Sequence, residues 1–373
     1  MPAPLLSPRA LNRTLLARQL LLERSSMTPV AALEHLVGLQ AQLPGSPYLA
    51  LRARLAGFDP HGLSGLVERR EAVRIALMRS TIHLVTADDA ARLRPVVQPV
   101  LDRELVTIRT WARGVEGVDL EPVLALGRSL TDERPRSMAD LRAEIAARWP
   151  DLDAGALAYA IRNRLPMVQA TPRGTWGRSG GVALTTLERW TGRPMGEPST
   201  VDDVIVRYLR AFGPATVADA AAWSRLTGLR EPFERLRPSL RTFRDERGRE
   251  LFDVPESPDA GAPILTGDEP APARLLPDYD NALLSHADRT RIVPPLPWPS
   301  LGDNITMPTF LVDGFAAGYW KPLGKGAAMR IEVHPLTAVS GADRVAVETE
   351  ASSLLAMLEP RADPGAIHWV EPD

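Results

Sequence analysis

Residues 201–254 read VDDVIVRYLRAFGPATVADAAAWSRLTGLREPFERLRPSLRTFRDERGRELFDV, and this stretch decides the fold. Residues 201–213 predict a helix, and Thr216 is placed to cap a second one. A third helix is expected near residues 231–236. Arg247-Gly248 then occupies the position of a hairpin turn between two strand-like runs. Three helices followed by a β-hairpin describe a winged helix.

The same order of elements occurs in two earlier blocks of the chain. In the first block, helices are predicted over 11–22, from Thr28-Pro29 onward and over 47–55, and two short strands over 73–85. In the second block, helices are predicted from Pro122, from Ser137 through 149 and near 154–164, and a glycine-rich wing over 174–181. Such units are also common in proteins that do not bind DNA, so the pattern alone leaves the function open.

The chain is therefore predicted to have an α+β fold with four regions. Winged-helix units are expected over residues 1–118, 119–198 and 199–258, and a strand-rich C-terminal region over 259–373. Segments 192–198 and 256–272 are rich in proline and glycine, as linkers and domain edges are.

The composition narrows the classes of functional site. The chain has no cysteine, which excludes disulfides, thiolate metal sites and iron–sulfur clusters. Its histidines lack the spacing of zinc ligands, and it has no glycine-rich phosphate motif, so no cofactor and no metal are expected. Arginines interrupt the apolar residues at the N-terminus, where a signal peptide needs an unbroken apolar stretch. No later apolar stretch has membrane-spanning length. A soluble, cytoplasmic protein without a membrane partner is expected.

Charge is distributed unevenly, although the net charge is only -2. Residues 1–110 carry 14 basic and 9 acidic residues, whereas residues 261–373 carry 8 basic and 15 acidic ones. Only Lys321 and Lys325 are lysines, so 42 of the 44 basic residues are arginines. Arginine suits bidentate phosphate contacts, but GC-rich coding would produce the same bias.

Gln40 is a polar residue on an otherwise apolar helix face. If the helix that begins at Pro29 continues, Leu33, Leu36, Val37 and Gln40 fall on one stripe at helical spacing. An unpaired buried amide costs roughly 1 to 3 kcal/mol, so this amide needs a partner or a cavity. Gln42 would point away in a continuous helix, but termination before Pro44 allows both amides to converge. Alternatively, Gln40 caps the helix end and Gln42 is solvated.

Four segments resemble winged-helix DNA glycosylases of the AlkZ and YcaQ type. They are GLQAQLPGSPYLALRARL (38–55), MRSTIHLV (78–85), LLPDYDNALLSHADRTR (275–291) and FLVDGFAAGYWK (310–321). Gln40-Ala41-Gln42 is similar to the Gln-x-Gln form of resistance glycosylases that protect producers of azinomycin-like DNA alkylators, whereas the housekeeping branch has Gln-x-Asp. The resemblance implies three tandem winged helices that clasp duplex DNA.

The chemistry of alkylated purines is compatible with an amide-based site. Alkylation at N7 makes the base a cation, so it leaves as a neutral group without a general acid. Gln40 and Gln42 are hypothesised to position water and to stabilise the oxocarbenium-like sugar, where ordinary glycosidases use carboxylates.

Because both lysines lie far down the chain, simple hydrolysis is favoured over lyase chemistry. A monomer that acts on duplex DNA containing alkylated purines is expected. The alternatives are a winged-helix transcription regulator and a non-catalytic binder of alkylated DNA.

Further residues are candidates for supporting roles. In an extended segment 79–84, Arg79, Thr81 and His83 face one side and are predicted to support the active site, with Arg79 as a phosphate ligand. By resemblance, segment 275–291 lies near DNA. The candidate DNA contacts are Arg289, Arg291, Tyr279, His286 and, by base stacking, Trp176. Packing is the alternative for Trp176, and a hydrogen-bonded turn in which Asp280 orients an arginine is the alternative for the segment.

Overall fold

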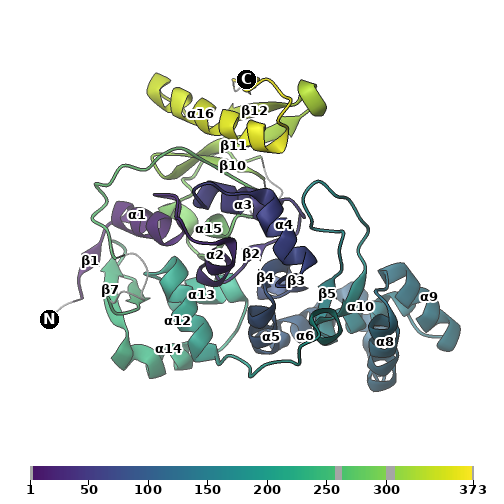
Figure 1. Cartoon of the computed structure of the whole chain (residues 1–373). Coiled ribbons are helices and arrows are strands. Elements are labelled where there is room, and N and C mark those ends of the chain that lie inside the picture. Colours follow the sequence, from purple (N-terminus) through teal and green to yellow (C-terminus); the bar gives the residue numbers. More distant parts are fainter. Residues whose placement is uncertain (1–2, 257–262, 300–306, 372–373) are drawn as a thin grey trace.

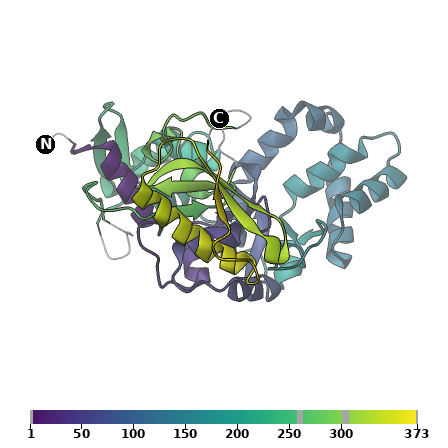
Figure 2. The same ribbon diagram turned by 90° about the horizontal axis from the view of Figure 1, so that it is seen from above.

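The computed structural model describes residues 3–256, 263–299 and 307–371 (Figure 1). It is a mixed helix-and-sheet fold, as predicted, and the strands of the described ranges form three sheets. In both views the β7 hairpin and helices α8–α10 lie at opposite ends of the molecule (Figures 1 and 2). No helix in the described part of the chain is long and apolar enough to cross a membrane.

The first block supplies helices and a hairpin near the middle of the molecule. Its helices are α1 (Pro8–Arg18), α2 (Pro29–His35), α3 (Ser46–Arg54) and α4 (Pro60–Glu68). Thr28 accepts a hydrogen bond from the Ala31 amide and caps α2, as the Thr28-Pro29 pair predicted. Helices α5 (Ala87–Val96), α6 (Gln98–Thr107) and α7 (Arg109–Val115) follow the hairpin.

The central sheet joins strands from two of the predicted units. Its order is β2-β4-β3-β5-β6, with β2 (Leu39–Gln40), β3 (Ala72–Ala76), β4 (Ile82–Thr86), β5 (Met167–Gln169) and β6 (Leu184–Thr186). All of its pairings are antiparallel, and Ile75 of β3 pairs with Val168 of β5. Strands of the second block thus complete the sheet of the first block. The boundary at residue 118 stays a prediction, and the predicted boundary at residue 258 lies outside the described residues.

The second and third blocks follow the predicted order of elements. Their helices are α8 (Glu121–Glu133), α9 (Met138–Arg148), α10 (Ala154–Arg164), α11 (Leu187–Thr191), α12 (Val201–Phe212), α13 (Val217–Ser224) and α14 (Arg230–Leu236). Ser137 and Thr216 each form a capping box. The third block ends in β7 (Arg241–Asp245) and β8 (Glu250–Asp253), which are joined by a turn with Gly248 at a φ of 76°. The N-terminal strand β1 (Leu5–Leu6) pairs parallel with β7.

The C-terminal region contains a five-stranded sheet covered by one long helix. The strand order is β13-β12-β11-β10-β9, with β9 (Arg274–Leu276), β10 (Thr309–Val312), β11 (Phe315–Leu323), β12 (Arg330–Pro335) and β13 (Ile367–Trp369). Helix α16 (Gly341–Leu358) packs its Val347 and Leu354 against Trp320 and Val333 of the sheet. The short helix α15 (Asn281–Leu284) follows β9 and leads back to the body of the molecule.

The predicted continuous helix through Gln40 is wrong. Helix α2 ends at His35, and Val37 and Gly38 adopt left-handed φ values of 55° and 81°. The Gly38 amide donates to the Leu33 carbonyl at 2.8 Å and closes the helix end. Gln40 therefore lies in β2, where its Cα is paired with that of His83 in β4.

Candidate functional site

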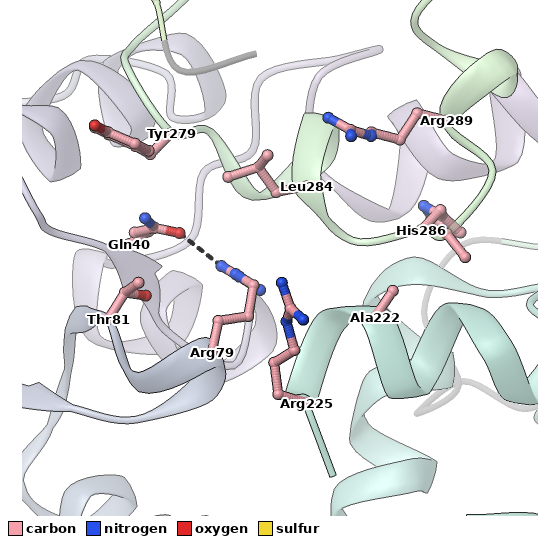
Figure 3. Close-up of a pocket in the computed structure, with 10 residues that line it drawn as sticks. Gln40, Arg79, Thr81, Ala222, Arg225, Tyr279, Leu284, His286 and Arg289 are labelled. Atoms are coloured by element: carbon pink, nitrogen blue, oxygen red, sulfur yellow. Dashed lines mark hydrogen bonds between the residues drawn. The ribbon is translucent and has the colours of Figure 1, made fainter. Parts of the chain in front are cut away.

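A cavity of about 400 Å³ lies where the first block, the third block and the C-terminal region meet. Its walls come from β2, the β3–β4 turn, the end of α13 and the segment after β9 (Figure 3). The lining residues are Gln40, Arg79, Thr81, Ala222, Arg225, Tyr279, Leu284, His286, Ala287 and Arg289. Residues far apart in the sequence thus form one cavity.

Gln40 contributes a primary amide to this cavity. The side chain is only 6% exposed, and its Oε1 accepts a hydrogen bond from Arg79 Nη2 at 2.7 Å. Within the described part of the chain, the Nε2 group has no hydrogen-bond partner. The oxygen keeps a second lone pair, so the amide has both acceptor and donor capacity for a ligand.

Arg79 links three parts of the molecule. Its Nη2 donates to Gln40, and its Nη1 donates to the Trp223 carbonyl near the end of α13 at 2.7 Å. Burial, and next the positive charge of Arg225, lower the pKa of the Arg79 guanidinium to about 10, which leaves it charged at neutral pH. Its φ of 56° is left-handed, as are those of Arg225 and Tyr279. Non-glycine residues with such backbones are often found at functional sites.

The other residues predicted to support the active site lie at different depths. Thr81 lines the cavity, and its hydroxyl donates to the Met78 carbonyl at 3.1 Å. His83 does not line the cavity and is fully buried, with Nδ1 3.0 Å from the Thr81 carbonyl oxygen. Burial, and next the charge of Arg79, lower the pKa of His83 to about 3, so the ring is neutral.

Gln42 does not join Gln40 in lining the cavity. Its side chain is exposed, and its Oε1 accepts a 3.3 Å hydrogen bond from the Ile82 amide. The predicted convergence of the two amides in one cavity is therefore not seen. Both amides are instead held by the same hairpin, Gln40 through Arg79 and Gln42 through Ile82.

Segment 275–291 holds the cavity together, and the turn that was the alternative for this segment, in which Asp280 orients an arginine, is present. Both Asp280 carboxylate oxygens accept hydrogen bonds from buried Arg54 at 2.8 Å. Asn281 donates to the Gly38 carbonyl at 2.8 Å, two residues before Gln40. These contacts fix the segment against α3 and β2 and so position Gln40.

The predicted DNA contacts of this segment separate into two groups. Tyr279, His286 and Arg289 line the cavity. The ring of His286 lies 3.1 Å from the Phe212 carbonyl, and burial, and next the charge of Arg291, lower its pKa to about 3. Arg291 itself is buried and donates to the Pro214 carbonyl at 2.8 Å, so it is not placed to contact a phosphate.

Trp176 lies on another part of the molecule. Its ring packs on Tyr48 with 5.0 Å between ring centroids, and its backbone amide donates to Ser64 at 2.9 Å. The structure thus shows the packing alternative for Trp176, and its stacking on a base stays a prediction. The glycine-rich wing folds back onto α3 and α4, since the Tyr48 hydroxyl donates to the Gly174 carbonyl.

Arg225 is a cavity residue that the sequence analysis missed. It follows α13 as the C-terminal cap, and its side chain rises beside Arg79 toward the centre of the cavity (Figure 3). Nothing in the local sequence distinguishes this arginine from the others. Among the described residues, no carboxylate and no lysine lines the cavity, and no cluster of acidic residues and histidines has the arrangement of a metal site.

Comparisons with known proteins agree with the motifs. The family described as DNA glycosylase AlkZ-like matches residues 33–357. The solved structure of the Streptomyces sahachiroi DNA glycosylase AlkZ is similar over 98% of this chain and 99% of that one, with a TM-score of 0.76 and 20% sequence identity, which shows a shared fold. A comparison with curated proteins gave no match. Because the family match spans most of its length, the chain belongs to the AlkZ-like DNA glycosylase family.

Proposed function

We propose that this DNA glycosylase hydrolyses the N-glycosidic bond of N7-alkylated purines in duplex DNA, with Gln40 beside the reacting sugar. One observation carries the proposal. The amide of Gln40 faces a cavity whose described lining has three arginines and neither a carboxylate nor a lysine. Such a cavity supplies dipoles and positive charge, and its substrate must bring its own activated leaving group.

An N7-alkylated purine meets this requirement. In the proposed step, a water oxygen forms a bond to C1′ of the sugar while the C1′–N9 bond breaks. The bonding electrons move to the base and neutralise its cation, and the water proton leaves to solvent. The second lone pair of Gln40 Oε1 is proposed to orient the water and to stabilise the positive charge that develops on the sugar.

The hydrogen bond from Arg79 gives Gln40 a fixed orientation. An amide that is held before the reaction begins needs no reorganisation when charge develops, which is the main source of electrostatic catalysis. Thr81 and neutral, buried His83 are proposed to support the hairpin beneath Gln40. Arg79, Arg289, Tyr279 and His286 are proposed to face the DNA.

Gln42 is proposed as the second amide of the site. Its side chain is exposed, and among the described residues one 3.3 Å hydrogen bond holds it, so it can turn toward a bound nucleotide at little cost. In this proposal Gln42 contributes when DNA is present, whereas Gln40 is positioned in advance.

We propose that the enzyme is monofunctional and acts as a monomer. A lyase of the Schiff-base type needs a lysine amine at the sugar, and Lys321 lies in β11, outside the cavity lining.

The cavity volume falls within the usual range of ligand sites and has room for a substituted purine. We extend the proposal to bulky N7 adducts and interstrand crosslinks of azinomycin-like alkylators, and hence to self-resistance. The reason is that Gln40-Ala41-Gln42 is similar to the Gln-x-Gln form of the resistance glycosylases.

The test uses a duplex that carries one N7-methylguanine. Release of the free base and strand cleavage at the resulting abasic site are measured for the wild type, Gln40→Ala and Gln42→Ala, against spontaneous loss without protein. Gln169→Ala serves as control, because Gln169 lies in β5 and does not line the cavity. We expect rapid release by the wild type and the control, and slower release by both site variants.

Other outcomes would contradict the proposal. Undiminished release by Gln40→Ala would remove Gln40 from the reaction. Tight binding of the duplex without any release by the wild type would favour a non-catalytic binder of alkylated DNA. Preference for one palindromic sequence, whether or not it is alkylated, would favour a transcription regulator. The same assay on a crosslinked duplex tests the extension to crosslinks.

A further inference from the structure

Two arginines, Arg225 and Arg79, meet in the cavity, and neither has an acidic partner in the part of the chain that the structure describes. Arg225 approaches Arg79 from the end of α13, and Arg289 projects from the opposite wall (Figure 3). The guanidinium of Arg225 is exposed and has no hydrogen bond or ion pair within the described ranges. Among the described residues, Arg79 finds partners for two of its five N–H donors, one at Gln40 and one at Trp223.

This arrangement is unfavourable in the free protein. Burial is the main cause of the lowered pKa of Arg79, and the positive charge of Arg225 is the second cause, so the two guanidinium groups repel each other. Both residues also have left-handed backbones, with φ values of 56° and 64°. An anion that bridges the two groups would turn this repulsion into attraction.

We propose that Arg225 and Arg79 together bind one phosphodiester group next to the target nucleotide, and that Arg79 thereby positions the sugar against Gln40. This inference rests on the proposed function. The free N–H donors of both guanidinium groups suit the oxygens of a phosphate. Since Arg79 keeps its bond to Gln40 Oε1, the phosphate, the guanidinium and the amide form one chain of contacts. Both arginines contact the phosphate, and Arg79 also positions the amide of Gln40.

The experiment replaces single phosphates by neutral methylphosphonates. A set of duplexes carries one N7-methylguanine and one methylphosphonate at successive linkages around it. Affinity and the single-turnover excision rate are measured for the wild type, Arg225→Gln and Arg225→Lys. Arg142→Gln is the matched control, because Arg142 is also exposed, lies on α9 and has no partner within the described ranges.

We expect one sensitive linkage beside the lesion. Its neutralisation should weaken wild-type binding or excision roughly tenfold, the loss expected for a charged hydrogen bond. In Arg225→Gln the same neutralisation should weaken the result by no more than about threefold, because the contact of Arg225 is already lost and only that of Arg79 remains. Arg225→Lys should restore part of the sensitivity, and Arg142→Gln should keep the full wild-type pattern. The slope of log affinity against log salt should fall by about 1 in Arg225→Gln only.

An unchanged methylphosphonate profile in Arg225→Gln would overturn this inference. That result can be told apart from failure of the proposed function. If the wild type binds the duplexes but releases no base, the proposed function fails, while the affinity profile still decides whether Arg225 contacts a phosphate. If base is released and the profiles of wild type and Arg225→Gln coincide, only the phosphate subsite is wrong.

Discussion

The bond between Gln40 and Arg79 predicts a measurable energetic coupling. The perturbations are Gln40→Met, Arg79→Met and the double variant, which remove the amide, the guanidinium or both while keeping unbranched side chains. The 2.7 Å bond joins an amide oxygen to a charged guanidinium that has only one other described hydrogen-bond partner, the Trp223 carbonyl. Hydrogen bonds to charged groups contribute about 1.5 to 3 kcal/mol.

The expected coupling energy between the two positions is therefore about 1.5 to 3 kcal/mol at pH 7, where Arg79 is charged. Urea unfolding followed by tryptophan fluorescence supplies the four free energies of unfolding, since the chain has 8 tryptophans. The values are comparable when all four proteins show single transitions with equal slopes. A coupling below about 0.5 kcal/mol would refute the claim that Arg79 fixes the amide of Gln40.

Three further predictions concern the parts of the molecule around the site. Gly38→Ala should lower the free energy of unfolding by about 2 to 4 kcal/mol and slow base excision, because φ is 81° and a Cβ would lie 2.3 Å from Val85 Cγ1. A urea unfolding midpoint equal to that of the wild type would contradict this prediction. The neutral ring of His83, with a pKa of about 3, must gain a proton on unfolding below pH 6.5, so stability falls as the pH is lowered from 6.5 toward 3. In His83→Gln the free energy of unfolding should depend less steeply on pH, by up to about 1.4 kcal/mol per pH unit. Urea titrations between pH 6.5 and 4.5 measure this free energy, and equal slopes against pH for the wild type and the variant would argue against the prediction. Trp176→Ala should destabilise the fold by about 1 to 3 kcal/mol through lost packing on Tyr48 and leave DNA affinity unchanged; a tenfold loss of affinity at unchanged stability would instead indicate base stacking.

Local signals predicted much of the fold. Ser137 and Thr216 were expected to cap helices, and both do so through capping boxes. The helix expected near 154–164 and the hairpin turn at Gly248 are also present. These features depend on neighbours within a few residues, where capping and turn chemistry operate. Helix α4 was missed although Asp59-Pro60 gives the same kind of start signal as Thr28-Pro29.

The site was predicted less well, because it depends on contacts between distant segments. Gln40 was singled out on the assumption of a helix, but Gly38 ends that helix and Gln40 reaches the cavity from a strand. Arg289 and Arg291 have equivalent local sequence, yet only Arg289 lines the cavity, since Arg291 is buried against Pro214. Arg225 enters the cavity through the packing of α13 against the β3–β4 turn, which periodicity does not reveal.

The single-turnover rate of N7-methylguanine release by Gln40→Met, at saturating protein, tests the central claim most directly. The substitution keeps the volume of the side chain and removes its hydrogen-bonding groups. We predict a rate lower than that of the wild type by a factor of roughly 100 to 1,000, the usual effect of removing one preorganised polar group, with DNA affinity within about threefold. A wild-type rate in this variant would contradict the account.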